Sequence, residues 1–357
     1  MASNRLLELL AMSNHITTFD SVARIFSPAE MVGRKFQNPV PTVVARPSVI
    51  LHTLRRLLTE RRIGEPQHAL GPFPTDPSVY AHPSLHGLRV TWMGHSTLLF
   101  EIDGHRILTD PVWSERASLV QFAGPKRFYA APLALRDLPP LDVVLLSHDH
   151  YDHLDRAAIQ QLAASPMTER AQWVCSLGVG RYLESWGVPR ACMTELNWGE
   201  TASIGDDCHI TATPARHFSG RALWGRNETL WSSFVIRGNR HNIFFGGDSG
   251  PFPGFAEIGD AYGPFDLTML EIGAYDADWP EIHMGPDHAA EAHIALRGKL
   301  LLPIHWGLFN LAFHPWREPV ERLMQIADSK NIPLFLPRPG APTEVTGGSL
   351  HTFWWEG

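Results

Sequence analysis

Short apolar runs recur along the chain from residue 88 onwards, and several of them alternate with polar positions. Asp103 and Gly104 separate two of these runs, and an Asp-Gly pair in such a place is a strong hairpin signal. The runs are shorter than an ordinary helix and are typical of strands with one or both faces buried. We therefore predict strands over 90–93, 97–102, 106–109, 142–147, 173–176, 209–213, 232–237, 242–246, 267–270 and 300–304.

Longer segments between these runs repeat their apolar positions with the spacing of an amphipathic helix. They predict helices over 154–164, 287–296 and 318–328, and Gly298 is a suitable stop for the second of them. Strands and helices alternate along the chain, with hairpins among them. This order is typical of sheets covered by helices, so the sequence predicts a layered α/β protein.

Residues 1–80 differ from the rest because they hold several prolines and few strand-like runs. We interpret them as an N-terminal extension of uncertain role, and residues 81–357 as the main domain. Residues 51–62 are typical of a basic amphipathic helix. Such a helix either touches an anionic membrane surface or lies on its own domain, and the second interpretation is favoured.

Composition limits the partners and the cellular compartment that we expect for the protein. A net charge of −7 supplies no basic excess to neutralise phosphates, so we expect no nucleic-acid partner. Three cysteines are an odd number and predict a reduced, cytoplasmic protein without a disulfide framework. No apolar run approaches the roughly 20 residues that a bilayer core requires. Contact at the periphery of a membrane stays open, as does the oligomeric state.

Residues 147–153, with the sequence SHDHYDH, place three imidazoles and two carboxylates directly after a predicted strand. Loops that leave strand ends can bring ligands together without breaking a sheet. Imidazole and carboxylate are suitable ligands for zinc and related divalent ions. His217, Asp248 and His305 each follow another predicted strand. Each has a simpler explanation alone, but together they predict a metal centre.

This order of residues, HxHxDH followed by a lone histidine, an aspartate and a final histidine, resembles the metallo-β-lactamase superfamily. The resemblance implies an αββα sandwich with two divalent metal ions, for which zinc is the expected metal. It also implies the ligands, which are His148, His150 and His217 for one ion, Asp152, His153 and His305 for the other, and Asp248 as a bridge between them.

A narrower resemblance covers residues 88–325. The segments GPKRF, LPPLDVVLLSHDHYDHLD, FGGDSG, GPFDL, IGAY and IHWG look like the family of N-acyl-phosphatidylethanolamine-hydrolysing phospholipase D and its bacterial relatives. This implies a catalytic domain at 81–357 that hydrolyses a small-molecule or lipid phosphodiester through a metal-bound hydroxide. Residues 1–80 carry no part of the resemblance.

Two residues are expected to take part in the chemistry. Asp152 would orient the hydroxide as well as bind metal, because a carboxylate beside a cation stays ionised. His283 lies where the phospholipase family has a histidine near the substrate phosphate. It is a candidate phosphate contact or general acid, with an ordinary surface-loop histidine as the alternative.

Other residues are expected to support the site. Gln121 and Tyr151 match substrate-facing positions of the phospholipase family, although Tyr151 has the alternative role of packing the metal loop. His95 and Asp110 are interpreted as outer partners that orient the ligands.

Three other functions remain open from the sequence. The same metals could open a lactone or a β-lactam, which requires no phosphate contact. A redox di-iron protein is disfavoured, because members of that type place Glu where Asp149 and His150 stand here. A non-catalytic zinc-binding protein is disfavoured by the complete ligand set.

Overall fold

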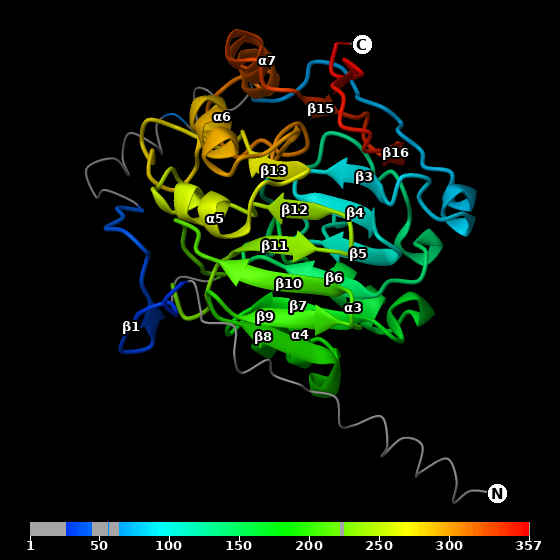
Figure 1. Ribbon diagram of the computed structural model, residues 1–357, viewed down its shortest axis with the longest axis vertical. Helices are drawn as coiled ribbons and strands as arrows, with labels where there is room; N and C mark the ends of the chain where they lie inside the picture. The colour runs from blue at the N-terminus through cyan, green and yellow to red at the C-terminus, as the bar shows by residue number, and fades with distance from the viewer. Residues whose placement is uncertain (1–25, 45–55, 57–63, 222–224, 357) are drawn as a thin grey trace, which may run out of the picture.

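Two mixed β-sheets pack face to face, and helices cover their outer faces (Figure 1). The structure is a computed structural model that describes residues 26–44, 56, 64–221 and 225–356. Its layers are those of an αββα sandwich, so the predicted fold class is confirmed.

The first sheet has seven strands in the order β16-β3-β4-β5-β6-β7-β8. Its strands β3 to β5 are antiparallel neighbours, whereas β5 to β8 run parallel. Helices α3 and α4 connect the parallel strands on the outer face. The bounds are β3 (Leu88–Gly94), β4 (Thr97–Ile102), β5 (His105–Thr109), β6 (Val143–Leu146), α3 (Arg156–Ala163), β7 (Gln172–Ser176), α4 (Gly180–Ser185), β8 (Met193–Leu196) and β16 (Thr343–Glu344).

The second sheet has six strands in the order β14-β13-β12-β11-β10-β9. Helices α5 and α6 cover it, and α7 packs against α6. The bounds are β9 (Thr201–Ile204), β10 (Cys208–Thr213), β11 (Ser233–Arg237), β12 (Asn242–Phe245), α5 (Gly254–Tyr262), β13 (Leu267–Glu271), α6 (Gly285–Ala295), β14 (Leu301–Ile304) and α7 (Glu318–Lys330).

The remaining elements are short. They are β1 (Met31–Val32), β2 (Lys35–Phe36), β15 (Phe335–Leu336), β17 (Leu350–His351), and the 3-10 helices η1 (Pro77–Ala81), η2 (Leu135–Asp137), η3 (Pro166–Thr168) and η4 (Arg190–Cys192).

Strand β6 shows how the sequence positions the site. Successive side chains of a strand point to opposite faces. Val143 and Leu145 therefore enter the core between the sheets, while Val144 and Leu146 enter the core beneath α3. Because both faces are buried, the segment reads as a continuous apolar run. The same burial fixes the direction in which the chain leaves β6 at Ser147, where the histidine-rich loop begins.

The predicted strands and helices agree with the structure to within a few residues, but β8, β9, α4 and α5 were not predicted, nor were the two-residue strands β1, β2, β15, β16 and β17. Strands β8 and β9 are half-exposed, so they offer few apolar positions as a signal. Helix α4 is only six residues long. Helix α5 contains Gly254 and Gly259, and glycine weakens the helical pattern.

The described part of the N-terminal extension contacts the main domain. The Asn38 side chain donates to the carbonyl of His217 at 2.7 Å and accepts from its N–H at 2.9 Å. Thr75 donates to the carbonyl of Gly340 at 2.6 Å. The predicted helix over 51–62 lies outside the described residues apart from Arg56, so the division at residue 80 stays a prediction.

Two predictions from composition can be compared with the structure. Cys175, Cys192 and Cys208 are free thiols, as the odd cysteine count indicated. Within the described ranges, no helix is both long and apolar enough to cross a bilayer.

Candidate metal centre

The predicted ligands meet at one end of the sandwich. The loop after β6 carries His148 to His153, and His217, Asp248 and His305 follow β10, β12 and β14. Strands β12 to β14 are parallel, and β10 is separated from β12 by one antiparallel strand. All three therefore run in the same direction, so their carboxyl ends lie at the same edge of the second sheet.

One group of ligand atoms consists of imidazole nitrogens. His150 Nδ1 lies 3.0 Å from His148 Nε2 and 3.2 Å from His217 Nε2. Asp248 Oδ2 lies 3.8 Å from the Nε2 atoms of both His148 and His217. These atoms are close enough to share one ion, and the arrangement matches the first predicted site.

A second group lies on the other side of Asp248. Asp152 Oδ2 is 3.6 Å from His153 Nε2 and 3.2 Å from His305 Nε2. Asp248 Oδ2 is 3.2 Å and 3.1 Å from the same two nitrogens. This one oxygen therefore borders both groups, which is the position that a bridging carboxylate requires.

Buried polar atoms without partners show that these residues fit a metal ion. Among the described residues, His153 Nε2 and Asp248 Oδ1 are buried and have no hydrogen-bond partner. A buried polar atom without a partner is costly and calls for an explanation. A divalent cation supplies it, because neutral imidazole and ionised carboxylate are the ligands that such a cation prefers.

The pKa values of the histidines shift in opposite directions in the two groups. Burial, reinforced by the neighbouring imidazoles, holds the pKa of His148 and of His217 well below the ordinary value of 6.5. Burial also lowers the pKa of His150. These three side chains are therefore neutral near pH 7, with lone pairs ready to bind a metal ion.

In the second group, the charges of neighbouring groups outweigh the effect of burial on the pKa values. Burial works against the protonated form of His305, but Asp248 and Asp152 raise its pKa to about 10. The same carboxylates raise the pKa of His153 well above its ordinary value, against the effect of burial. Burial would raise the pKa of Asp152 and Asp248, but the facing imidazoles hold both well below 3.8. Without metal, protons on His153 and His305 thus balance the carboxylates.

Outer partners orient the ligands, as predicted for Asp110 and His95. His153 donates from Nδ1 to Asp110 Oδ2 at 2.7 Å. Ser147 donates from its N–H and its hydroxyl to the two oxygens of Asp110, and its hydroxyl accepts from His148 Nδ1 at 2.9 Å. His95 donates from Nε2 to Asp152 Oδ2 at 3.0 Å. Such contacts fix the ring orientation and tautomer of metal-binding histidines.

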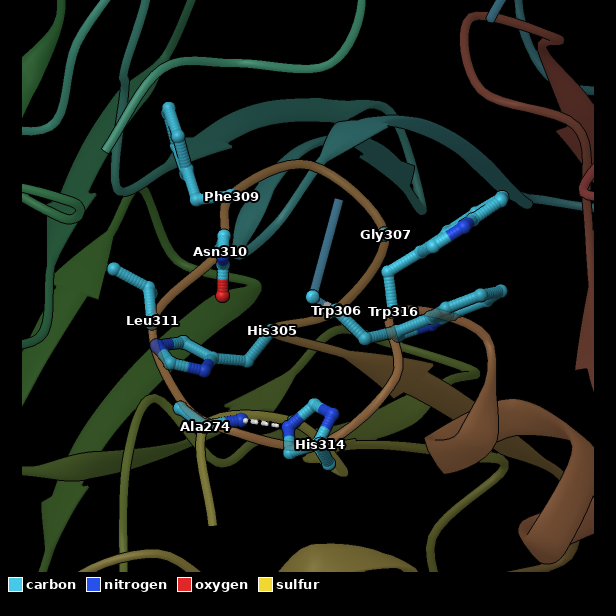
Figure 2. A pocket seen from close by; sticks show the side chains of 11 residues that line it. Ala274, His305, Trp306, Gly307, Phe309, Asn310, Leu311, His314 and Trp316 are labelled. Atoms are coloured by element: carbon cyan, nitrogen blue, oxygen red, sulfur yellow. Dashed lines mark hydrogen bonds between the residues drawn. The ribbon is translucent and has the colours of Figure 1, made fainter. Parts of the chain in front are cut away.

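The loop after β14 positions His305 (Figure 2). His305 has a positive φ of 61°, which is uncommon outside glycine and turns the chain sharply at the strand end. The loop closes where the Ala274 N–H donates to His314 Nε2 at 3.1 Å. The ring of His314 also stacks on Tyr275. The loop after β13 is thereby joined to the loop that begins at His305.

Sequence analysis missed Glu271, the last residue of β13. Its wholly buried carboxylate accepts from His283 Nδ1 at 2.7 Å, from the Ser249 N–H at 2.9 Å and from the Met284 N–H at 3.2 Å. The same signal that indicated Asp248, a carboxylate just after an apolar run, was present in the segment DLTMLEIG.

A cavity of about 360 Å³ opens over the ligands. His283 and Arg226 line it together with Asp152, Asp248 and other ligands. The rest of its wall is apolar and comprises Val44, Phe218, Ala274, Trp279, Ile282 and Leu311. The cavity can therefore take a substrate that has both a polar reacting group and an apolar arm.

Of the three predicted substrate-facing residues, the structure places one in the wall of the cavity. His283 faces the cavity. Gln121 exchanges two hydrogen bonds of 3.1 Å with the backbone of Arg116 in its own loop and does not line the cavity. Tyr151 donates to the carbonyl of Arg221 at 2.6 Å, and the Arg221 guanidinium lies 4.1 Å from its ring centre. Tyr151 packs the metal loop, so roles for it and Gln121 in substrate binding stay predictions.

Comparison with known proteins gives a consistent picture. Residues 105–306 match the family model of the β-lactamase superfamily domain. An uncharacterized protein of Mycobacterium tuberculosis is 46% identical over 290 residues, which cover 79% of this chain and 77% of that protein. N-acyl-phosphatidylethanolamine-hydrolyzing phospholipase D 1 of Caenorhabditis elegans is 37% identical over 254 residues, which cover 68% of this chain and 71% of the relative.

A solved structure shares the fold. The metallo hydrolase Igni18 from the archaeon Ignicoccus hospitalis has a TM-score of 0.54 at 22% identity, and the match covers 72% of this chain and 97% of Igni18. At this level of identity the likeness concerns the fold alone.

We predict that metal binding depends on Asp248. The purified protein should hold close to two divalent ions per chain, and Asp248→Asn should hold fewer and lose activity with them, because a neutral amide cannot offset two cations. Elemental analysis together with hydrolysis assays measures both. Asp266→Asn, which changes a carboxylate at the opposite end of β13, is the matched control. Full occupancy and normal turnover in Asp248→Asn would place the bridge elsewhere.

We also predict that the two ions are lost at different pH values. Metal must displace protons from His153 and His305, so affinity at their site falls as pH falls. His148, His150 and His217 are already neutral and compete less with protons. Dialysis from about pH 8 down to about pH 5.5, followed by elemental analysis, should show one ion leaving first. Loss of both ions in a single step would contradict this order.

Proposed function

The chain belongs to the metallo-β-lactamase superfamily of metal-dependent hydrolases, and from this premise we propose that it is a binuclear, zinc-dependent phosphodiesterase. Its proposed substrates are N-acyl-phosphatidylethanolamine-like lipids or related phosphodiesters. The observation that carries the proposal is the cavity, where the metal ligands, the His283 imidazole and the Arg226 guanidinium face one space with apolar walls. That combination suits an anionic ester with a hydrocarbon arm.

The chain's own side chains would divide the work. When bound, two divalent ions offset charge on the phosphate oxygens and lower the pKa of a water molecule. Asp152 and Asp248 stay ionised and would hold the metal ions. His283, whose Nδ1 is engaged by Glu271, presents Nε2 to the cavity and would give its proton to the leaving oxygen. The apolar wall would exclude water and receive an acyl or alkyl arm.

Arg226 adds a positive charge to the cavity. Its guanidinium carbon lies 4.6 Å from the ring centre of Phe218, and that ring packs on His150 and His217. By contrast, Arg216 bonds to Glu281 and to backbone carbonyls, and so is committed within the protein. No hydrogen bond or ion pair holds Arg226 to another described residue, so its donors are available to a phosphate oxygen.

A substrate panel tests the proposed reaction. Metal-replete protein should hydrolyse phosphodiesters faster than lactones or β-lactams. The reverse preference would overturn the phosphodiesterase assignment while leaving the metal centre intact.

His283→Ala should retain both metals yet lose much of the phosphodiesterase rate. General acid help is worth about 10²–10⁴-fold, and an alkyl leaving group depends on it. The loss should shrink for a nitrophenyl leaving group, because that group needs no proton. Steady-state kinetics on both substrate types measures the difference. Equal losses would rule out the acid role, and no loss on either substrate would make His283 an ordinary loop histidine.

Arg226→Ala should raise KM more than it lowers kcat. Hydrogen bonds to charged groups contribute about 1.5–3 kcal/mol, so kcat/KM should fall roughly 10- to 100-fold. Arg226→Lys should recover only part of the loss, because an ammonium lacks the two-pronged guanidinium geometry. Arg240→Ala, which removes an exposed arginine bonded to Asp103, is the control. An unchanged KM in Arg226→Ala would remove this residue from substrate binding.

A further inference from the structure

The buried carboxylate of Glu271 is surrounded by hydrogen-bond donors. Its Oε1 accepts from the N–H groups of Ser249 and Met284, and its Oε2 accepts from His283 Nδ1. The two N–H groups can only donate, and when Glu271 is ionised Nδ1 donates as well, so both oxygens of the side chain then serve as acceptors. None of the family resemblance rests on this residue.

The arrangement determines which nitrogen of His283 carries a hydrogen. A ring whose Nδ1 donates to a carboxylate must hold a hydrogen there, and its Nε2 is then the atom left for the cavity. The ring lies between those of His217 and His305, with ring centres 5.1 Å and 5.4 Å away. Rotation by a half-turn would place a carbon atom opposite Glu271 and lose the hydrogen bond.

We propose that Glu271 is a positioning residue that keeps the hydrogen of His283 on Nδ1 and turns Nε2 toward the leaving group of the substrate. The inference rests on the proposed function, in which His283 Nε2 supplies the proton for that leaving group. Glu271 touches neither substrate nor metal in this role and acts only through His283.

With the His283 hydrogen kept on Nδ1, every bond and proton in the hydrolysis is accounted for. Water oxygen bonds to phosphorus, the bond from phosphorus to the leaving oxygen breaks, and its electron pair goes to that oxygen. The leaving oxygen takes the Nε2 proton of the His283 imidazolium. The ring becomes neutral with its hydrogen still on Nδ1, where Glu271 accepts it before and after the transfer. A proton from the attacking water returns the ring to its starting state through solvent.

Glu271→Gln tests the proposal because an amide has only one acceptor atom. If the amide oxygen keeps the Ser249 and Met284 N–H groups, its NH₂ group faces His283 Nδ1. The ring must then accept at Nδ1 and carry its hydrogen on Nε2. The neutral ring can still donate a hydrogen bond to a phosphate oxygen, so KM should change little. Proton transfer should be slower, because after it the ring would have to hold its hydrogen on Nδ1, where the amide NH₂ group now faces it.

Three measurements on the full-length, metal-replete protein separate the possible roles. Glu271→Gln should keep both metals. It should lose at least 10-fold in kcat on alkyl phosphodiesters and little on a nitrophenyl ester. In a His283→Ala background the same substitution should cost almost nothing further, because residues that act as a unit are not additive. Glu195→Gln is the control, since Glu195 also accepts from two backbone N–H groups, at 2.8 Å and 3.1 Å.

Each contrary outcome has its own meaning. Equal losses on both leaving groups, or additive losses in the double variant, would reduce Glu271 to holding the backbone of its loops and overturn the proposal. Nitrogen NMR of ¹⁵N-histidine-labelled protein, with His283 assigned by its loss in His283→Ala, reads the tautomer without any substrate. A wild-type ring without a hydrogen on Nδ1 would also overturn the proposal. If the tautomer is as expected but no phosphodiester is hydrolysed, the proposed function fails and the positioning role stands.

Discussion

Asp248 Oδ2 lies 3.1–3.8 Å from the Nε2 atoms of four buried histidines, and the rest of the site depends on how that charge is balanced. Packing so many titratable groups away from water is unfavourable unless opposite charges compensate them. Protons on His153 and His305 can do so in part. Divalent cations do so more completely, because they also satisfy the ligand atoms that lack a hydrogen-bond partner.

The sandwich makes this concentration of charge possible by supplying a rigid frame. The ligands stand at the ends of strands whose own side chains are buried on both faces, so the loops have little freedom to relax. His95, Asp110 and His305 all have positive φ values, of 56°, 37° and 61°. Backbone strain of this kind persists only where the surrounding structure holds it, and here it occurs at the ends of β3, β5 and β14.

Chemistry and specificity are carried by different parts of the cavity. The chain belongs to a superfamily of metal-dependent hydrolases, and the candidate ligand set is where a metal-assisted hydrolysis would take place. His283, Arg226 and the apolar wall line the same cavity beyond the ligands, and in the proposed function they would select the ester and assist its leaving group. Glu271 connects the two parts, because its Oε2 bonds to His283 Nδ1 and also lies 3.9 Å from Nδ1 of the ligand His305.

The sequence by itself determined the fold class, because apolar runs of strand length leave a local signal. Imidazole and carboxylate groups directly after those runs also predicted which side chains meet at one end of the sandwich, and the family resemblance supplied their assignment as metal ligands, which stays a prediction. The sequence did not reveal the half-exposed strands β8 and β9, whose polar positions look like loop. Nor did it reveal Arg226, which lies in no motif, or the pairing of Glu271 with His283. A sequence match favoured Gln121, but its amide is engaged by its own loop. Only the tertiary structure decided these points, since which side chains face a cavity depends on how the two sheets bring distant loops together.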